Sequence, residues 1–247
     1  MAIYKKKRLD RILVEAGLAP TRSRAADLVR LGAVSVEGRI VPKPGALYPP
    51  DVALAVAPDA SPYVSRGGLK LAAALDRFGL EPEGRVALDL GASTGGFTEV
   101  LLSRGAAQVF AVDVGRDQLH ARLRGDSRVV DLSGVDARAL DAERVTSPPS
   151  LVVSDVSFIS LTKALPAALH LAAPGADLVA LIKPQFEAGR EHVGKGGLVK
   201  DPEIIARVER DIVAFLEGRG WSVKGLAESP ITGGEGQVER LVWATKR

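Results

Sequence analysis

The chain has 247 residues, and its 33 Lys and Arg exceed its 30 Asp and Glu to give a net charge of +3. Hydrophobic residues make up 46% and charged residues 26%, which supports a buried core and excludes global disorder. The absence of Cys excludes a disulfide scaffold, a thiol nucleophile and a Cys-ligated zinc site. His120, His170 and His192 are the only imidazoles and lie far apart in sequence, so we expect no metal site.

The excess positive charge is concentrated in the first quarter of the chain. Residues 1–60 contain ten Lys or Arg and six Asp or Glu, a balance of +4, whereas residues 61–247 contain 23 and 24, a balance of −1. The basic run Lys5-Lys6-Lys7-Arg8 opens this quarter. The asymmetry predicts a nucleic-acid-binding module attached to a near-neutral body.

No segment of the sequence indicates export or membrane insertion. The first residues become basic after Tyr4 and leave no room for the apolar core of a signal peptide. The apolar run from Ala164 to Ala173 contains Pro166 and is far shorter than the roughly 20 residues that a membrane span needs. We therefore expect a cytoplasmic protein with no membrane partner.

Apolar spacing predicts a small α+β module at the amino-terminal end. Helical spacing over residues 9–16 stops at Gly17, and Thr21 or Ser23 can cap a second helix. A Glu-Gly-Arg turn between two β-branched stretches predicts a hairpin. The expected elements are a helix over 9–16, a helix ending at Gly32, hairpin strands over 34–36 and 40–41, and an apolar stretch over 52–56.

Basic side chains punctuate this module and suit phosphate recognition, because a guanidinium group is planar and always charged. A solvated basic face is the ordinary interpretation of any one of them. The motifs Arg-Leu-Asp (8–10), Gly-Ala-Val-x-Val-x-Gly (32–38) and Lys-Pro-Gly (43–45) are more specific. They resemble the small alpha-L-motif RNA-binding domain of a ribosomal small-subunit protein, pseudouridine synthases and tyrosyl-tRNA synthetases. The resemblance implies binding of structured RNA, largely through phosphates, by Arg8, Arg11, Arg22, Arg24, Lys43 and Arg66.

The Pro-rich segment Pro58–Pro62 predicts a linker, and we place the domain boundary between residues 60 and 61. Beyond it, apolar strand patterns alternate with helical patterns, as in a doubly wound α/β fold with a mostly parallel, Rossmann-like sheet of seven strands. The expected strands are 86–89, 109–113, 129–132, 151–155, 178–183, 221–227 and 241–245. The expected helices are 71–79, 96–104, 117–124, 161–173 and 202–219.

A Gly-rich turn follows the first of these strands. The segment Asp89-Leu90-Gly91-Ala92-Ser93-Thr94-Gly95-Gly96-Phe97-Thr98 lacks the Gly-x-Gly-x-x-Gly spacing of dehydrogenases, and taken alone it could be a tight βα turn. Asp113 ends the second strand, 22 residues after Gly91, where a carboxylate can accept hydrogen bonds from the ribose hydroxyls of a nucleoside.

Together with Ala-Val-Asp-Val-Gly at 111–115, this turn resembles the S-adenosylmethionine-dependent methyltransferases. The resemblance implies that S-adenosyl-L-methionine is the cofactor and that Asp136 faces the adenine amino group. The residues expected to hold the cofactor are Asp89, Gly91, Ser93, Gly95, Gly96, Phe97, Asp113, Val114, Asp136 and Ala137.

Four charged residues stand out by position in the expected fold. Asp155 and Lys183 close two central strands, at the edge where open α/β sheets bind ligands. Lys70 lies at the start of a helix and Glu239 at the start of the last strand. Each alone is ordinarily a salt bridge, a cap or a strand-end charge. In this order they resemble the Lys-Asp-Lys-Glu tetrad of ribose 2′-O-methyltransferases of the FtsJ type.

The flanking motifs narrow the resemblance. The segments Tyr63-Val64-Ser65-Arg66-Gly67-Gly68, Asp155-Val156-Ser157-Phe158-Ile159-Ser160-Leu161 and Lys183-Pro184-Gln185-Phe186-Glu187 are similar to those of the TlyA (haemolysin-A-type) rRNA methyltransferases. The resemblance implies ribose 2′-O-methylation of ribosomal RNA, at cytidine, in one or both ribosomal subunits. Lys183 is then the candidate base, or the group that holds the hydroxyl, while Asp155 and Glu239 position the lysines.

Two other functions stay open. The family's historical label suggests a pore-forming cytolysin, although the sequence has no evident basic amphipathic helix with aromatic anchors. A non-catalytic RNA-binding or ribosome-assembly factor would use the first module and would not need the tetrad. Liposome leakage and methyl transfer are the assays that separate these functions. Nothing in the sequence specifies an oligomer, and we assume a monomer.

Overall fold

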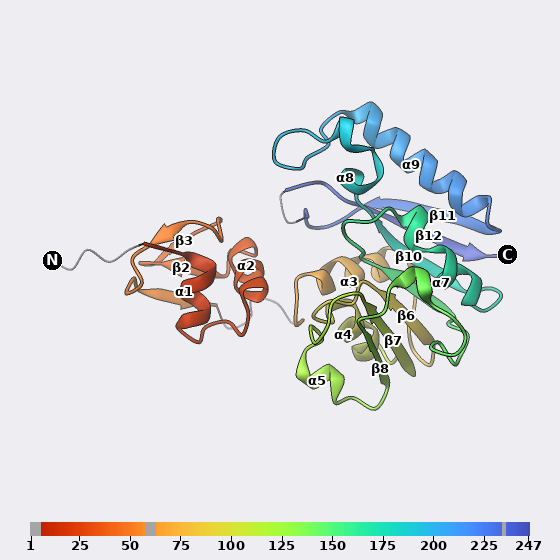
Figure 1. Cartoon of the computed structure of the whole chain (residues 1–247), viewed down its shortest axis with the longest axis horizontal. Coiled ribbons are helices and arrows are strands. Elements are labelled where there is room, and N and C mark those ends of the chain that lie inside the picture. The colour runs from red at the N-terminus through yellow and green to blue at the C-terminus, as the bar shows by residue number, and fades with distance from the viewer. Residues whose placement is uncertain (1–5, 58–62, 234–235) are drawn as a thin grey trace. The chain divides into compact units, whose positions relative to one another are not determined.

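The computed structural model describes residues 6–57, 63–233 and 236–247 (Figure 1). Its contacts divide the chain into two compact units, Met1–Arg66 and Gly67–Arg247. The expected linker over 58–62, and with it the boundary expected between residues 60 and 61, lies outside the described residues, as does Lys5 of the basic run. Residues 63–66 belong to the first unit, where the Nε of Arg66 lies 3.1 Å from the Oδ1 of Asp27.

The first unit packs two helices on short antiparallel strands. Strand β2 is the centre of the three-stranded sheet β3-β2-β5, and β1 pairs with β4. Its core contains Leu9, Leu13, Leu28, Val29 and Val34. The elements are β1 (Lys7–Arg8), α1 (Leu9–Glu15), α2 (Arg22–Arg30), β2 (Val34–Val36), β3 (Arg39–Ile40), β4 (Leu47–Tyr48) and β5 (Leu54–Val56).

Local sequence explains the start of α2 and the tight turn between β2 and β3. The hydroxyl of Thr21 accepts a hydrogen bond from the backbone N–H of Arg24, so Thr21 rather than Ser23 caps α2. Glu37 and Gly38 both have left-handed backbone angles, with φ of 49° and 77°. Such a two-residue turn matches the twist of the strands and sets the register in which Val36 faces Arg39.

The second unit is a seven-stranded sheet with helices on both faces (Figure 1). The strand order is β11-β12-β10-β9-β6-β7-β8, and β12 is antiparallel to both of its neighbours. The strands are β6 (Val86–Leu90), β7 (Gln108–Asp113), β8 (Val129–Ser133), β9 (Leu151–Ser154), β10 (Asp177–Ile182), β11 (Trp221–Glu228) and β12 (Arg240–Lys246). The expected α/β fold with a mostly parallel sheet is thus confirmed.

The helices of this unit differ from the expected ones in three places. Helix α3 begins at Gly67, earlier than expected. Asp117 has a left-handed φ of 54°, so the helix expected from 117 begins only at Ala121. Pro166 has no N–H for a helical bond and divides the expected helix 161–173 into α6 and α7. The helices are α3 (Gly67–Phe78), α4 (Gly96–Ser103), α5 (Ala121–Arg124), η1 (Ala137–Ala139), α6 (Leu161–Ala164), α7 (Pro166–Leu171), α8 (Pro184–Glu187), η2 (Arg190–His192) and α9 (Pro202–Glu217).

The strand order reverses direction beside β6. The chain proceeds from β6 to β7 and β8 on one side and then returns to β9 on the other side. At such a reversal the connections leave in opposite directions, which opens a crevice at the carboxyl ends of the strands. The topology therefore places a ligand site at the ends of β6, β7 and β9.

Candidate active site

Parallel register brings two strand ends together at this crevice. Ser154, the last residue of β9, lies beside Leu90 of β6 and Ala180 of β10. The N–H of Asp155 donates to the carbonyl of Leu90 at 2.9 Å, which continues the ladder by one residue. Lys183 immediately follows β10. The side chains of Asp155 and Lys183 are thus fixed by adjacent strands and emerge at the same sheet edge.

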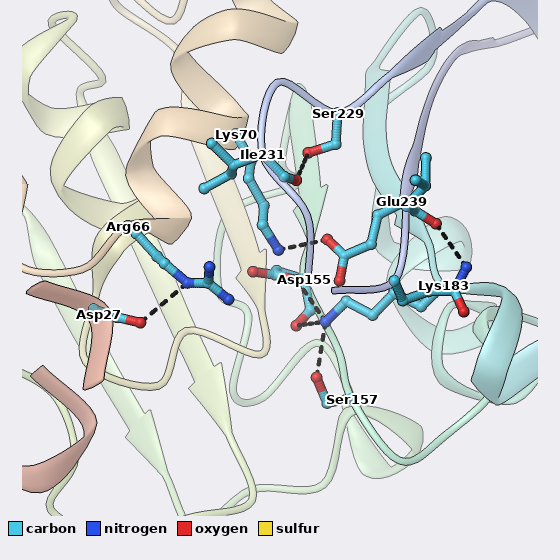
Figure 2. A network of polar contacts seen from close by, with 11 residues as sticks. Asp27, Arg66, Lys70, Asp155, Ser157, Lys183, Ser229, Ile231 and Glu239 are labelled. Atoms are coloured by element: carbon cyan, nitrogen blue, oxygen red, sulfur yellow. Dashed lines mark hydrogen bonds and ion pairs between the residues drawn. The ribbon is translucent and has the colours of Figure 1, made fainter. Parts of the chain in front are cut away.

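Lys183 is held by the residues that follow β9 (Figure 2). Its Nζ lies 2.7 Å from the Oδ1 of Asp155 and donates a 2.8 Å hydrogen bond to the Oγ of Ser157. A longer 3.3 Å bond reaches the carbonyl oxygen of Asp155. The lysine is only 6% exposed. These contacts compensate for the cost of burying its charge.

Lys70 and Glu239 form a second buried ion pair (Figure 2). The Nζ of Lys70, on α3, lies 2.5 Å from the Oε2 of Glu239, and the residues are 5% and 2% exposed. Glu239 directly precedes β12, whose Arg240 pairs with Ile182 of β10, so the antiparallel ladder directs Glu239 toward Lys183. The carbonyl of Glu239 also accepts a hydrogen bond from the N–H of Ser229.

The structure therefore brings the four tetrad residues together as two ion pairs that face one another (Figure 2). Two ammonium groups balance two carboxylates, so the cluster carries no net charge. Both carboxylates fix the position of a lysine, and fixed amines are suited to hold a hydroxyl and move its proton. The described residues contain no group of three or more His, Cys, Asp or Glu placed to hold a metal ion.

A cavity of about 1050 Å³ lies beside the tetrad. Asp155 and Ser157 line it, whereas Lys70, Lys183 and Glu239 are absent from its lining. Six of the residues expected to hold the cofactor also line it: Gly91, Ser93, Asp113, Val114, Asp136 and Ala137. A single cavity thus joins the end of β7, where a nucleoside is expected, to the loop that holds Lys183.

Asp113 is preorganised at the end of β7. Its Oδ2 accepts the backbone N–H of Ser93 at 2.9 Å, and its Oδ1 accepts that of Gly115 at 2.7 Å. Each oxygen keeps further lone pairs that can accept ribose hydroxyls. Gly91 has φ of 82°, and a Cβ there would lie 3.0 Å from the carbonyl oxygen of Asp155. Only glycine fits this close approach, so the floor of the cavity stays open.

Asp89 lies in β6 below the glycine turn and is completely buried. Its Oδ2 accepts a 2.7 Å hydrogen bond from the hydroxyl of Thr98, while its Oδ1 has no hydrogen-bond partner among the described residues. Burial, with a smaller contribution from the nearby charge of Asp155, raises the pKa of Asp89 to about 7 against the opposing hydrogen bond from Thr98. Asp89 is absent from the cavity lining, so its unpaired oxygen lies enclosed below the glycine turn.

Asp136 is engaged by its own neighbour. It caps η1 by accepting the N–H of Arg138 and pairs with the guanidinium of the same residue at 2.6 Å. The hydrogen bonds from Arg138 lower the pKa of Asp136 to about 2. Both residues line the cavity. Asp136 can face an adenine there, but Arg138 competes for its oxygens.

The remaining cofactor candidates shape the turn rather than line the cavity. Gly95 caps α4 with a left-handed φ of 97°, and a Cβ there would clash with the side chain of Leu123. Gly96 and Phe97 are buried in the first turn of α4. These residues bear on cofactor binding through the path of the backbone.

The basic residues expected to bind RNA are distributed over the first unit. Arg8 and Arg22 both contact the buried carboxylate of Asp10, at 2.8 Å and 3.5 Å. Arg11 pairs with Glu15 on α1, and Lys43 is exposed. Arg24 lies in the first turn of α2. Arg66 is mostly buried against Asp27, so its guanidinium is less accessible than those of Arg8 and Arg22.

Sequence reasoning gave no role to Ser157, Gln118 or Glu187. Ser157 bonds Lys183, and Gln118 bonds the hydroxyl of Ser93. Glu187 accepts hydrogen bonds from Ser160 and Leu161. Ser157 and Glu187 stood within the quoted motifs, two residues after Asp155 and four residues after Lys183, and this proximity in sequence was the available signal. Gln118 lies in the part of the expected helix 117–124 that is not helical in the structure, and no motif marked it.

Comparisons with known proteins agree with this arrangement. A family model described as FtsJ-like methyltransferase matches residues 63–246, and an S4 domain model matches residues 7–51. The chain is 45% identical over 240 residues to the 16S/23S rRNA (cytidine-2′-O)-methyltransferase TlyA of Mycobacterium tuberculosis, covering 97% of this chain and 90% of that protein. Hemolysin A of Brachyspira hyodysenteriae is 39% identical over 236 residues, covering 95% and 98%.

A solved structure from Streptococcus thermophilus, whose name also refers to a hemolysin, has a TM-score of 0.78 and 43% identity. The match covers 98% of this chain and 88% of that one. Both units therefore have counterparts in single relatives of similar length. The chain belongs to the FtsJ-like methyltransferases and, within them, to the family that includes TlyA and Hemolysin A.

Proposed function

We propose that this protein transfers a methyl group from S-adenosyl-L-methionine to the ribose 2′-hydroxyl of a cytidine in ribosomal RNA. The observation that carries the proposal is the single cavity that joins Asp113 to Asp155 and Ser157, which hold Lys183. The names of the relatives supply the nucleoside and the class of RNA. A ribosomal substrate would place the enzyme in the cytoplasm, as the sequence led us to expect.

The residues present fit the cofactor. The fixed carboxylate of Asp113 can accept ribose hydroxyls, and the Gly91 floor admits a close ligand. When bound, S-adenosylmethionine supplies an electrophilic methyl group on a sulfonium. The protein then has to hold a ribose hydroxyl, exclude water and remove one proton.

We assign proton removal to Lys183. To act as the base, Lys183 must first lose a proton from its ammonium group to solvent. Its neutral Nζ would then exchange a contact to Asp155 or Ser157 for the ribose 2′-oxygen and accept the hydroxyl proton. If Lys183 stays charged, it would instead hold that oxygen while the hydroxyl proton leaves to solvent. Asp155 keeps the amine at the edge of the cavity. Lys70 and Glu239 form the facing ion pair outside the cavity lining, where Glu239 fixes the position of Lys70. We assign RNA binding to the S4 unit, through Arg8, Arg22 and their basic neighbours.

The test is transfer of labelled methyl to purified ribosomal RNA and to isolated small and large subunits, followed by mapping of the methylated ribose. We expect 2′-O-methylcytidine in one or both subunits. The matched control is the Lys183→Arg variant, which should bind cofactor without transferring methyl. A methyl group on a base, or no transfer to any ribosomal substrate, would overturn the proposal.

Two alternative functions, membrane damage and ribosome assembly, predict different assay results with the same purified protein. The Hemolysin A relative favours testing for membrane damage, although no helix in the described parts of the chain is long and apolar enough to cross a bilayer. Release of dye from liposomes by the purified protein would support that function. A ribosome-assembly factor would bind subunits equally well with intact or substituted tetrad residues and would transfer no methyl group.

A further inference from the structure

The loop that carries Asp155 and Ser157 has an unusual backbone. Phe158 has φ of 65°, in the left-handed region that a bulky side chain rarely adopts. Such a conformation is strained and persists only where the surroundings hold it. The side chain of Phe158 is 91% exposed, so little burial energy compensates. Contacts at the two ends of the loop must therefore maintain its shape.

The first end is fixed by Lys183, through Asp155 and Ser157. The second end is fixed by Glu187, four residues further along the same segment. The Oε2 of Glu187 accepts a 2.5 Å bond from the hydroxyl of Ser160, and its Oε1 accepts a 2.7 Å bond from the N–H of Leu161. The ring of Phe186 lies 5.2 Å from that of Phe158 between these ends.

Glu187 makes these bonds without a countercharge. No ion pair to it is found among the described residues, and burial raises its pKa from the ordinary value despite the opposing bonds from Ser160 and Leu161. A half-buried carboxylate without a cation is costly to retain. The two hydrogen bonds that Glu187 accepts, from the N-cap residue Ser160 and from the first helical residue Leu161 of α6, offset that cost.

We propose that Glu187 is a positioning residue for the methyl-transfer reaction, because it brackets the strained loop 155–161 and so keeps Asp155 and Ser157 against Lys183. This inference rests on the proposed function. Glu187 touches neither the ribose nor the cofactor and acts through the loop. Displacement of a reacting group by about 1 Å can cost roughly a hundredfold in rate, so loss of the bracket should lower kcat strongly.

The experiment compares Glu187→Ala, Glu187→Asp and Glu187→Gln in the full-length chain, with rRNA as substrate. Gln can accept the Leu161 N–H and bond the Ser160 hydroxyl, whereas Asp keeps the charge and is one methylene shorter. We expect kcat to fall about tenfold to a hundredfold in the Ala and Asp variants and to stay within about threefold of wild type in the Gln variant. Cofactor affinity, measured by calorimetry, should change by less than about threefold in all three.

Glu191→Ala is the matched control, because Glu191 is exposed on the neighbouring η2 and, among the residues that the structure describes, forms an ion pair only with His192. Circular dichroism and thermal melting check folding, and if the Ala variant does not fold, the Asp and Gln variants decide. A low kcat in Glu187→Gln with a normal kcat in Glu187→Asp would mean that the charge of Glu187 matters rather than its two hydrogen bonds, and would overturn the proposal. Unchanged kcat in both Ala and Asp would do the same. An inactive wild type would instead refute the proposed function.

Discussion

Lys183 and Asp155 lie 2.7 Å apart, Nζ to Oδ1, at the ends of two adjacent parallel strands. Neither residue belongs to its strand, since β9 ends at Ser154 and β10 at Ile182. Their distance is nevertheless fixed by the sheet, because the register of the strands leaves each side chain little freedom. The chemistry assigned to Lys183 therefore depends on a rigid part of the fold.

Lys183→Arg tests that assignment directly. Arginine keeps the positive charge, cannot lose a proton at neutral pH, and is too large for a position that is almost fully buried. We expect cofactor affinity within about threefold of wild type and a fall in kcat of at least a hundredfold, the upper part of what a general base contributes. Single-turnover methyl transfer measures the chemical step. Near-normal turnover in this variant would refute the assignment.

Asp113 offers a test of the cofactor end of the cavity. Hydrogen bonds to a charged group contribute about 1.5–3 kcal/mol each, so Asp113→Ala should weaken cofactor binding by tenfold or more. Isothermal calorimetry with S-adenosylmethionine measures this in the absence of RNA. Asp117→Ala is the control, since Asp117 is a nearby exposed carboxylate outside the cavity lining. Equal affinities in the two variants would contradict the placement of the nucleoside.

The strands of the second unit were predictable because their signals are local. Continuous apolar runs, such as 151–153 and 178–182, specify buried parallel strands, and the bounds in the structure agree to within a residue or two. The tetrad was predictable only as an ordered set, through resemblance. Its arrangement as two separate ion pairs depends on register between β10 and β12, which no local pattern encodes.

Other features could not be read from the sequence. The left-handed backbone of Phe158 has no local sequence signal, and the hydrogen bond from Ser160 to Glu187 joins residues 27 positions apart. The division of the helix expected over 161–173 was visible in advance as Pro166, but its apolar periodicity continued across the break. Long-range contacts and strain therefore account for most of what was missed.

Arg8 and Arg22 test the RNA-binding assignment of the first unit. Both guanidinium groups contact Asp10, yet the side chains of Arg8 and Arg22 remain 51% and 62% exposed and can reach phosphates. The double variant Arg8→Ala, Arg22→Ala should weaken rRNA binding and reduce the slope of log affinity against log salt by about 1 for each lost phosphate contact. Filter binding over a range of salt concentrations measures both quantities.

Arg39→Ala is the control for that experiment, because Arg39 is an exposed residue of the same unit that was not assigned to RNA. It should change the salt slope less than the double variant does. A double variant with weaker binding but an unchanged slope would show that these guanidiniums do not neutralise phosphates. Equal effects in control and double variant would show a general effect of charge instead.

Asp89 gives the unfolding free energy a pH dependence of its own. Its pKa of about 7 in the folded protein exceeds the ordinary value of 3.8, so the folded state binds the proton more tightly than the unfolded state. The associated stability is fully present below about pH 4 and is lost as pH rises through about 7. The difference of roughly three pH units corresponds to about 4 kcal/mol once both states are ionised.

Asp89→Asn removes this ionisation while keeping an acceptor for the Thr98 hydroxyl. Urea unfolding between pH 5 and pH 8 should therefore show a flatter dependence of the unfolding free energy on pH for the variant than for wild type. The stability of the variant relative to wild type should be greater at pH 8 than at pH 5. Asp211→Asn, on the exposed face of α9, should leave the wild-type profile unchanged. Parallel profiles for Asp89→Asn and wild type would mean that Asp89 is already ionised at pH 5, so that Thr98 and the surrounding dipoles outweigh the cost of burial.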